Sequence, residues 1–124
     1  MSHSLLIFHS LFRAATCLCI LAITYLSLAP TEAIVRTGFF PHIEHLAAYA
    51  GTSFCVAMGW TNRQTCGYIV IALALYSGLL ELMQSFAVGR SPGLWEFCWN
   101  IMGIVFGMTL ARSLLPMITS FYQK

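Results

Sequence analysis

The chain has 124 residues, of which 59% are hydrophobic and only 8% are charged, and its formal net charge is +2. About a quarter of the residues of a soluble domain are charged, so this composition indicates a membrane protein. The positive charge is small and forms no basic stripe, which excludes nucleic acid as an expected partner. Because a helix needs about 20 apolar residues to cross a bilayer, the chain has room for four spans and for no further soluble domain.

Four apolar stretches in chain order predict four transmembrane helices, at 14–29, 43–60, 66–86 and 94–117. We expect an all-α membrane fold, a compact bundle in one domain over residues 1–124, with the helices running up-down-up-down. The first stretch also resembles a cleavable secretory signal, but Pro30 directly after it disfavours cleavage, and we expect a retained helix. The preceding residues 4–12 are apolar enough to lie at the membrane interface or to lengthen the first span.

The basic residues predict the orientation of this bundle. An N-in, C-in topology places four of them in the cytoplasm and two outside, as the positive-inside rule favours. The inside residues are Arg13, Arg63, Arg112 and Lys124, and the outside residues are Arg36 and Arg90. All the glutamates then lie toward the outside: Glu32, Glu44, Glu81 and Glu96. We therefore expect a polar mouth on the extracytoplasmic face of the membrane.

Pairs of small residues four apart predict where the helices pack closely, because such pairs let helix backbones approach in lipid. One pair occurs in each of the last three stretches: Ala47-x3-Gly51, Ala74-x3-Gly78 and Gly103-x3-Gly107. These three helices are expected to form a tight bundle, with the bulkier first helix at its periphery. The five cysteines have no metal-ligand spacing, and we interpret them as packing residues.

The second stretch opens with a cluster of ionisable residues. His42, His45 and Tyr49 are three and four residues apart and share one helical face. Pro41 suits the first turn of a helix, and Glu44 near this terminus complements the helix dipole. The alternative is that Glu44 and the histidines have no functional role and only lie at a helix start at the level of the lipid headgroups.

The third and fourth stretches add polar residues at the same end of the bundle. Glu81 is embedded among leucines, with Gln84 on the same face, and an ionisable residue inside an apolar span usually turns inward to a partner. Pairing with an arginine to brace the bundle is the structural alternative for Glu81. Helix capping explains Glu96, but it does not explain Asn100 one turn deeper in an apolar span. Arg90, in the preceding turn, has a guanidinium suited to a carboxylate or phosphate.

The ordered set of these motifs resembles the VanZ-like family, a group of small bacterial integral membrane proteins. The residues that carry the resemblance lie between Pro41 and Gly107: Glu44-His45-Leu46-Ala47-Ala48-Tyr49, Gly78-Leu79-Leu80-Glu81-Leu82-Met83-Gln84, Gly89-Arg90-Ser91 and Glu96-x3-Asn100-x2-Gly103. The family is named for a member involved in resistance to the glycopeptide teicoplanin. The resemblance implies a multi-pass protein of the bacterial inner membrane, in the cell envelope, with a role in envelope or glycopeptide stress. Family members often carry an Asp-Lys pair where this chain has Pro41 and His42, and commonly an Asp at the position of Glu96.

Three classes of function follow from these residues and from the resemblance. The first is a binding protein for an anionic or amphipathic envelope molecule, such as a lipid-linked precursor, held by Tyr49, Gln84, Arg90, Glu96 and Asn100. The second is a membrane-embedded enzyme in which His45 and Glu81 are the acid–base groups; its metal-dependent form would use His42, His45 and one or two glutamates. The third, a transporter, is disfavoured because no line of polar residues crosses the apolar half of the bundle. No metal and no cofactor are expected, since no strong ligand motif is present, and the oligomeric state stays open.

Overall fold

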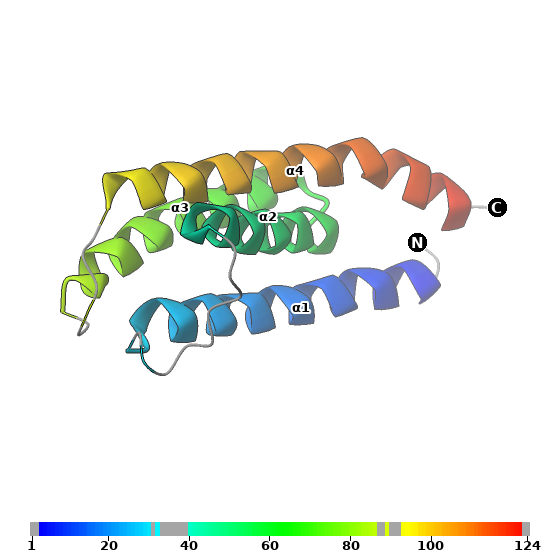
Figure 1. Ribbon diagram of the computed structural model, residues 1–124. Helices are drawn as coiled ribbons and strands as arrows, with labels where there is room; N and C mark the ends of the chain where they lie inside the picture. Colours follow the sequence, from blue (N-terminus) through cyan, green and yellow to red (C-terminus); the bar gives the residue numbers. More distant parts are fainter. Residues whose placement is uncertain (1–2, 31, 33–39, 87–88, 90–92, 123–124) are drawn as a thin grey trace.

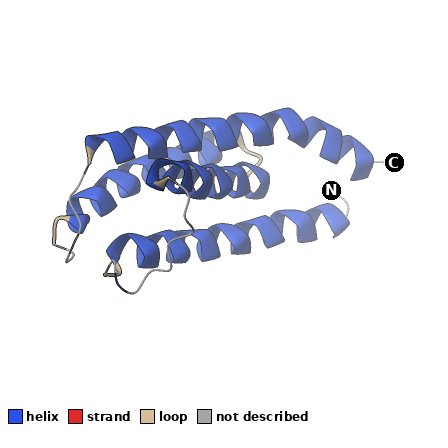
Figure 2. Cartoon of the chain, viewed as in Figure 1, coloured by secondary structure: helices blue, strands red, loops and turns tan. Residues whose placement is uncertain are grey.

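The computed structural model describes residues 3–30, 32, 40–86, 89 and 93–122, and this part of the chain holds four long helices and no strand (Figure 2). The helices are α1 (His3–Leu28), α2 (Pro41–Gly59), α3 (Arg63–Gln84) and α4 (Leu94–Tyr122). They alternate in direction, so α1 and α3 end where α2 and α4 begin (Figure 1). We call this end, which carries Glu44, Glu81 and Glu96, the glutamate end. The prediction of an all-α bundle of four helices is confirmed.

The helix boundaries differ from the predicted apolar stretches. The first helix begins at His3 rather than at residue 14, so residues 4–12 lengthen it. The third begins at Arg63, because the Asn62 side chain accepts hydrogen bonds from the backbone N–H groups of residues 64 and 65 and caps the helix. The last helix continues through Pro116 to Tyr122. Hydropathy marks where a helix is apolar, whereas capping decides where it begins.

Three of the four helices, α1, α3 and α4, are long and apolar enough to cross a membrane. The remaining helix, α2, packs on both α4 and α1 and carries many of the fully buried residues, including Thr52, Ser53, Val56 and Met58. A helix enclosed by other helices can carry hydroxyl groups because it faces little lipid. The prediction of four membrane-spanning helices is therefore supported for three of them.

The closest helix pair is α2 and α4, whose backbones meet at two glycines. A Cβ atom added to Gly103 would overlap the carbonyl oxygen of Leu46, and one added to Gly107 would overlap the carbonyl oxygen of Ala50. The prediction that helix backbones approach closely at Gly103 and Gly107 is thus confirmed. Among the described residues, nothing lies within 4 Å of a Cβ added to Gly51, so the packing role predicted for that residue is wrong.

The predicted position of the first helix is also wrong, since α1 packs well on α2 and it is α3 that approaches its neighbours least closely. The reason lies at Gly78, where an added Cβ would meet the ring of Phe97 rather than backbone. An aromatic ring thus fills the space that a small-residue contact would have closed. The small-residue pattern identified Gly78 as a packing position but not the size of its partner.

Hydrogen bonds at the far end of the bundle attach α1 to α2. His9 Nδ1 lies 2.6 Å from the carbonyl oxygen of Met58, and Arg13 Nε donates to the carbonyl oxygen of Gly59 over 2.9 Å. The Arg13 guanidinium also lies over the Trp60 ring, 5.4 Å from its centroid. The last carbonyls of a helix have no partner within the helix, and apolar surroundings leave no water to satisfy them. Side chains of α1 therefore complete the C-terminal end of α2.

Candidate functional site

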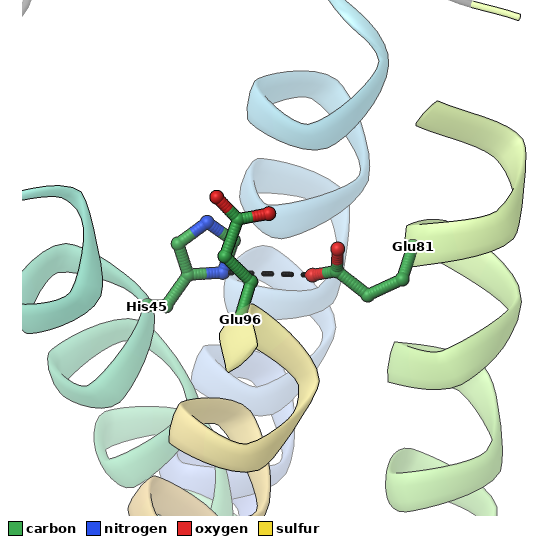
Figure 3. Close-up of side chains that lie close together, drawn as sticks. All are labelled: His45, Glu81 and Glu96. Carbon is green, nitrogen blue, oxygen red and sulfur yellow. Dashed lines mark ion pairs between the residues drawn. The ribbon is translucent and has the colours of Figure 1, made fainter. Parts of the chain in front are cut away.

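At the glutamate end, three side chains from three helices form a hydrogen-bonded chain (Figure 3 draws its two ionisable members). His45 lies in the second turn of α2, Asn100 in the second turn of α4, and Glu81 in the last turn of α3. His45 Nδ1 is 2.9 Å from Asn100 Oδ1, and Asn100 Nδ2 donates to Glu81 Oε1 over 3.1 Å. The structure thus brings together residues that lie 55 and 19 positions apart in the sequence.

The fully buried Asn100 determines how the protons of this chain are arranged. The amide nitrogen of Asn100 donates to Glu81, so its oxygen faces His45. The oxygen in turn only accepts, so His45 Nδ1 carries the proton in that hydrogen bond. In the neutral imidazole the other nitrogen, Nε2, is then the one with a lone pair. Asn100 therefore orients the His45 ring and selects its tautomer.

Glu81 is nearly buried, with an exposed fraction of 6%. Its Oε1 atom, besides accepting from Asn100, lies 3.8 Å from His45 Nδ1, the pair marked by the dashed line in Figure 3. Its second oxygen, Oε2, is buried and has no hydrogen-bond partner in the described part of the chain. The backbone N–H of Gly93 also approaches this carboxylate, and a ligand at Oε2 would supply the partner that this oxygen lacks.

The partly buried Glu96 completes the group. One ligand atom each from His45, Glu81 and Glu96 lie within 4.8 Å of one another, and Figure 3 shows the two carboxylates converging on the imidazole from different helices. Gly93 makes room for this arrangement, because a Cβ added there would lie 3.3 Å from Glu96 Oε2. We call His45, Glu81, Glu96 and Asn100 the polar cluster.

Of the other predicted site residues, Tyr49 and Gln84 are buried close to the polar cluster, and Gln84 Nε2 has no hydrogen-bond partner among the described residues. Arg90 lies outside the described residues. His42 is separate from the polar cluster, since its ring stacks on Trp99 with the centroids 5.8 Å apart. Of the seven residues predicted for ligand binding or acid–base chemistry, a set that does not include His42, the polar cluster contains four. Their functional roles stay predictions.

A cavity of about 130 Å³ opens between α1 and α2 beside the polar cluster. Its polar lining comes from Ser27, Glu44, His45 and Tyr49, and its apolar lining comes from Ile23, Leu26 and Ala48. His45 belongs to both the cavity wall and the polar cluster. Sequence analysis missed the α1 residues because it placed that helix at the periphery, and nothing in the apolar pattern of α1 distinguishes Ser27 from its neighbours.

The fold and composition thus define a helical bundle with three helices long and apolar enough to cross a membrane and a buried His–Asn–Glu chain at one end. Comparison of the chain with protein-family models, with curated proteins and with solved structures found no match. The VanZ-like resemblance stays a prediction that rests on the short motifs quoted above.

Proposed function

We propose that this is a VanZ-like integral membrane protein of the bacterial inner membrane that binds an amphipathic envelope molecule, such as a lipid or lipid-linked precursor, at the glutamate end. The observation that carries the proposal is the position of His45, which lines the cavity and belongs to the polar cluster. A polar group in this cavity therefore reaches a buried hydrogen-bond chain directly. An apolar tail can follow the exposed apolar surfaces of the helices, which include Leu21, Leu26 and Ile43.

The size and chemistry of the cavity support this choice of ligand. Pockets that enclose a whole small molecule usually measure about 300–1,000 Å³, so a cavity of about 130 Å³ accepts only one end of a larger molecule. The carboxylate in the cavity wall is that of Glu44, and a carboxylate accepts hydrogen bonds, which favours a polar end that bears hydroxyl or ammonium groups. Binding of a ligand whose polar end is anionic would depend on Arg90, the residue whose guanidinium the sequence analysis assigned to a carboxylate or phosphate.

The distribution of charge supports the extracytoplasmic side for this site. The described arginines lie away from the glutamate end: Arg13 contacts the last residues of α2, and Arg63 is the first residue of α3. Arg112 lies 16 residues beyond Glu96 on α4, about 24 Å along the helix axis. The positive-inside rule then favours cytoplasmic arginines and an outward-facing glutamate end.

The proposal is tested by filling the cavity. Ala48 is partly buried in the cavity wall and the adjacent Ala47 is exposed on the same helix, so Ala48→Leu and Ala47→Leu are a matched pair. We expect native mass spectrometry in mild detergent to detect wild type and Ala47→Leu with at least one of three added lipids: phosphatidylethanolamine, phosphatidylglycerol or a polyprenyl phosphate. Ala48→Leu is expected to retain at least tenfold less. Equal retention by both variants at equal thermal stability would contradict the proposal.

A second candidate function is favoured by the 3.8 Å approach of His45 and Glu81. Two ionisable groups at this distance, oriented by Asn100, are the arrangement used for general acid–base catalysis. In that case the protein would be a membrane-embedded enzyme acting on the molecule in the cavity. Incubation of the bound lipid with wild type and with Glu81→Gln distinguishes the two functions, because only an enzyme converts the lipid and loses this conversion in the variant.

A further inference from the structure

The polar cluster gathers two carboxylates, and the nearest basic group in the described structure is His45, whose Nδ1 lies 3.8 Å from Glu81 Oε1. Glu81 and Glu96 present carboxylates within 4.8 Å of each other, and Glu81 is nearly buried. The three described arginines lie away from this end. Like charges at such a distance in apolar surroundings repel strongly. A group that neutralises both carboxylates at once would remove this repulsion.

The donor atoms in the polar cluster suit a metal ion. Imidazole nitrogen and carboxylate oxygen are ordinary Zn²⁺ ligands, and three protein ligands that leave one position open are typical of catalytic zinc sites. The tautomer selected by Asn100 leaves His45 Nε2 with a lone pair. A metal-bound histidine almost always donates its other ring N–H to a nearby oxygen, and His45 Nδ1 already does so to Asn100 Oδ1.

The unpartnered oxygen of Glu81 is an independent indication of a ligand. The Glu81 side chain is more than nine-tenths buried, with an exposed fraction of 8%. Oε2 is buried as well, without a hydrogen-bond partner in the described part of the chain. Glu81 comes from α3, whereas His45 comes from α2 and Glu96 from α4, and its carboxylate points toward both (Figure 3). The oxygen that faces His45 is Oε1, and Oε2, which lacks a partner, is the second oxygen of the same carboxylate.

We propose that His45, Glu81 and Glu96 bind one divalent transition-metal ion, with Zn²⁺ as the best match, and that Asn100 is a positioning residue for this site. Bond lengths of about 2.0–2.1 Å at tetrahedral angles place ligand atoms about 3.3 Å apart. One nitrogen of His45 and one oxygen of each carboxylate now lie within 4.8 Å of one another, and Nδ1 is the nitrogen closer to Glu81 Oε1, at 3.8 Å. Binding through Nε2 therefore requires the carboxylate side chains to rotate toward that nitrogen. A neutral imidazole, two carboxylates and a divalent ion have no net charge. The open position would face a water molecule or the polar group of a bound molecule.

The test uses Zn²⁺ alone and purified protein in detergent, with no lipid added, so its outcome is independent of the proposed function. We expect equilibrium dialysis to find one tightly bound Zn²⁺ per chain and Glu81→Gln and Glu96→Gln each to weaken binding at least a hundredfold. Asn100→Ala is expected to weaken it tenfold to a hundredfold, the usual effect of losing a partner that orients a ligand. Glu32→Gln is the control, because it removes an exposed carboxylate of the same charge and is expected to change affinity less than twofold.

Glu96→Gln keeps the test decisive if Glu81→Gln fails to fold, because Glu96 is only partly buried and lies in the first turn of α4. Absence of stoichiometric Zn²⁺ binding would overturn the proposal. Binding that persists equally in both glutamine variants would also overturn it, since the ion would then be held by other histidines or cysteines of the chain.

Discussion

The contact between α2 and α4 leads to a sharp prediction for Gly107→Ala. The added Cβ would overlap the carbonyl oxygen of Ala50, and it would lie only 2.7 Å from the carbonyl carbon of the same residue. That separation is 0.7 Å short of the 3.4 Å at which ordinary van der Waals contact begins. Because the obstacle is backbone inside a helix, it cannot rotate away. The α2 and α4 helices must move apart instead.

The size of the effect follows from the contacts that this separation weakens. The full dispersion energy of one pair of facing atoms is about 0.1–0.2 kcal/mol. A gap of about 0.5–1 Å removes a quarter to a half of this energy. If about 50 pairs are affected, the number that one buried leucine makes, the loss is about 1–5 kcal/mol. The better helix propensity of alanine returns up to about 1 kcal/mol. We therefore expect a net destabilisation of about 2 kcal/mol, within limits of about 0.3–4 kcal/mol.

Unfolding of the purified protein in mixed micelles of rising SDS content measures this free-energy difference. Gly51→Ala and Gly67→Ala are matched controls, because nothing lies within 4 Å of a Cβ at either position and both lie within helices. They are expected to be neutral or slightly stabilising. If Gly107→Ala unfolds at the same SDS content as Gly51→Ala, α2 and α4 do not approach as closely as described, and the reasoning is wrong.

Two further predictions concern the ends of α2 and α3, and the same unfolding assay tests both. Arg13→Ala removes the hydrogen bond to the Gly59 carbonyl and the contact with the Trp60 ring. Because Arg13 is exposed, we expect a loss of about 1–1.5 kcal/mol, at the low end for hydrogen bonds to charged groups. An effect no larger than that of Arg63→Ala, which removes another exposed arginine, would contradict it. Asn62→Ala removes the side-chain cap of α3 and is expected to lower the unfolding free energy by about 1 kcal/mol, whereas Thr61→Ala, in the same exposed link, is expected to change little.

Much of the fold could be predicted because the residue types within each stretch of sequence determine whether it forms an apolar helix. The four stretches, the first-turn position of Pro41 and the close contact at Gly103 and Gly107 all follow from residue type and spacing. The spacing of small residues does not show which residue of another helix each of them contacts. Gly51 and Gly107 look alike in the sequence, yet one lies open and the other touches backbone.

The polar cluster was predictable for a similar reason. An ionisable side chain inside an apolar helix has few favourable positions, so Glu81 was expected to turn inward. Asn100 was singled out because helix capping does not explain it, and both residues are buried. Their mutual hydrogen bond and the tautomer of His45 depend on the relative rotation of three helices, which the sequence does not state. The cavity beside α1 was missed for the same reason, since its wall is formed by contacts between helices.

The lengths of the helices have a consequence for the membrane itself. With 19 residues, α2 measures about 28 Å, whereas α1 with 26 residues and α4 with 29 measure about 39 and 44 Å. A hydrocarbon layer of about 30 Å covers the first of these lengths but not the other two. The surplus turns of α1 and α4 pack on each other, as the rings of Phe8 and Tyr122 show, and tilt or burial among the headgroups must accommodate them. The bundle is therefore longer on one side than the bilayer is thick, which makes its tilt, and with it the depth of the glutamate end, sensitive to the thickness of the surrounding lipid.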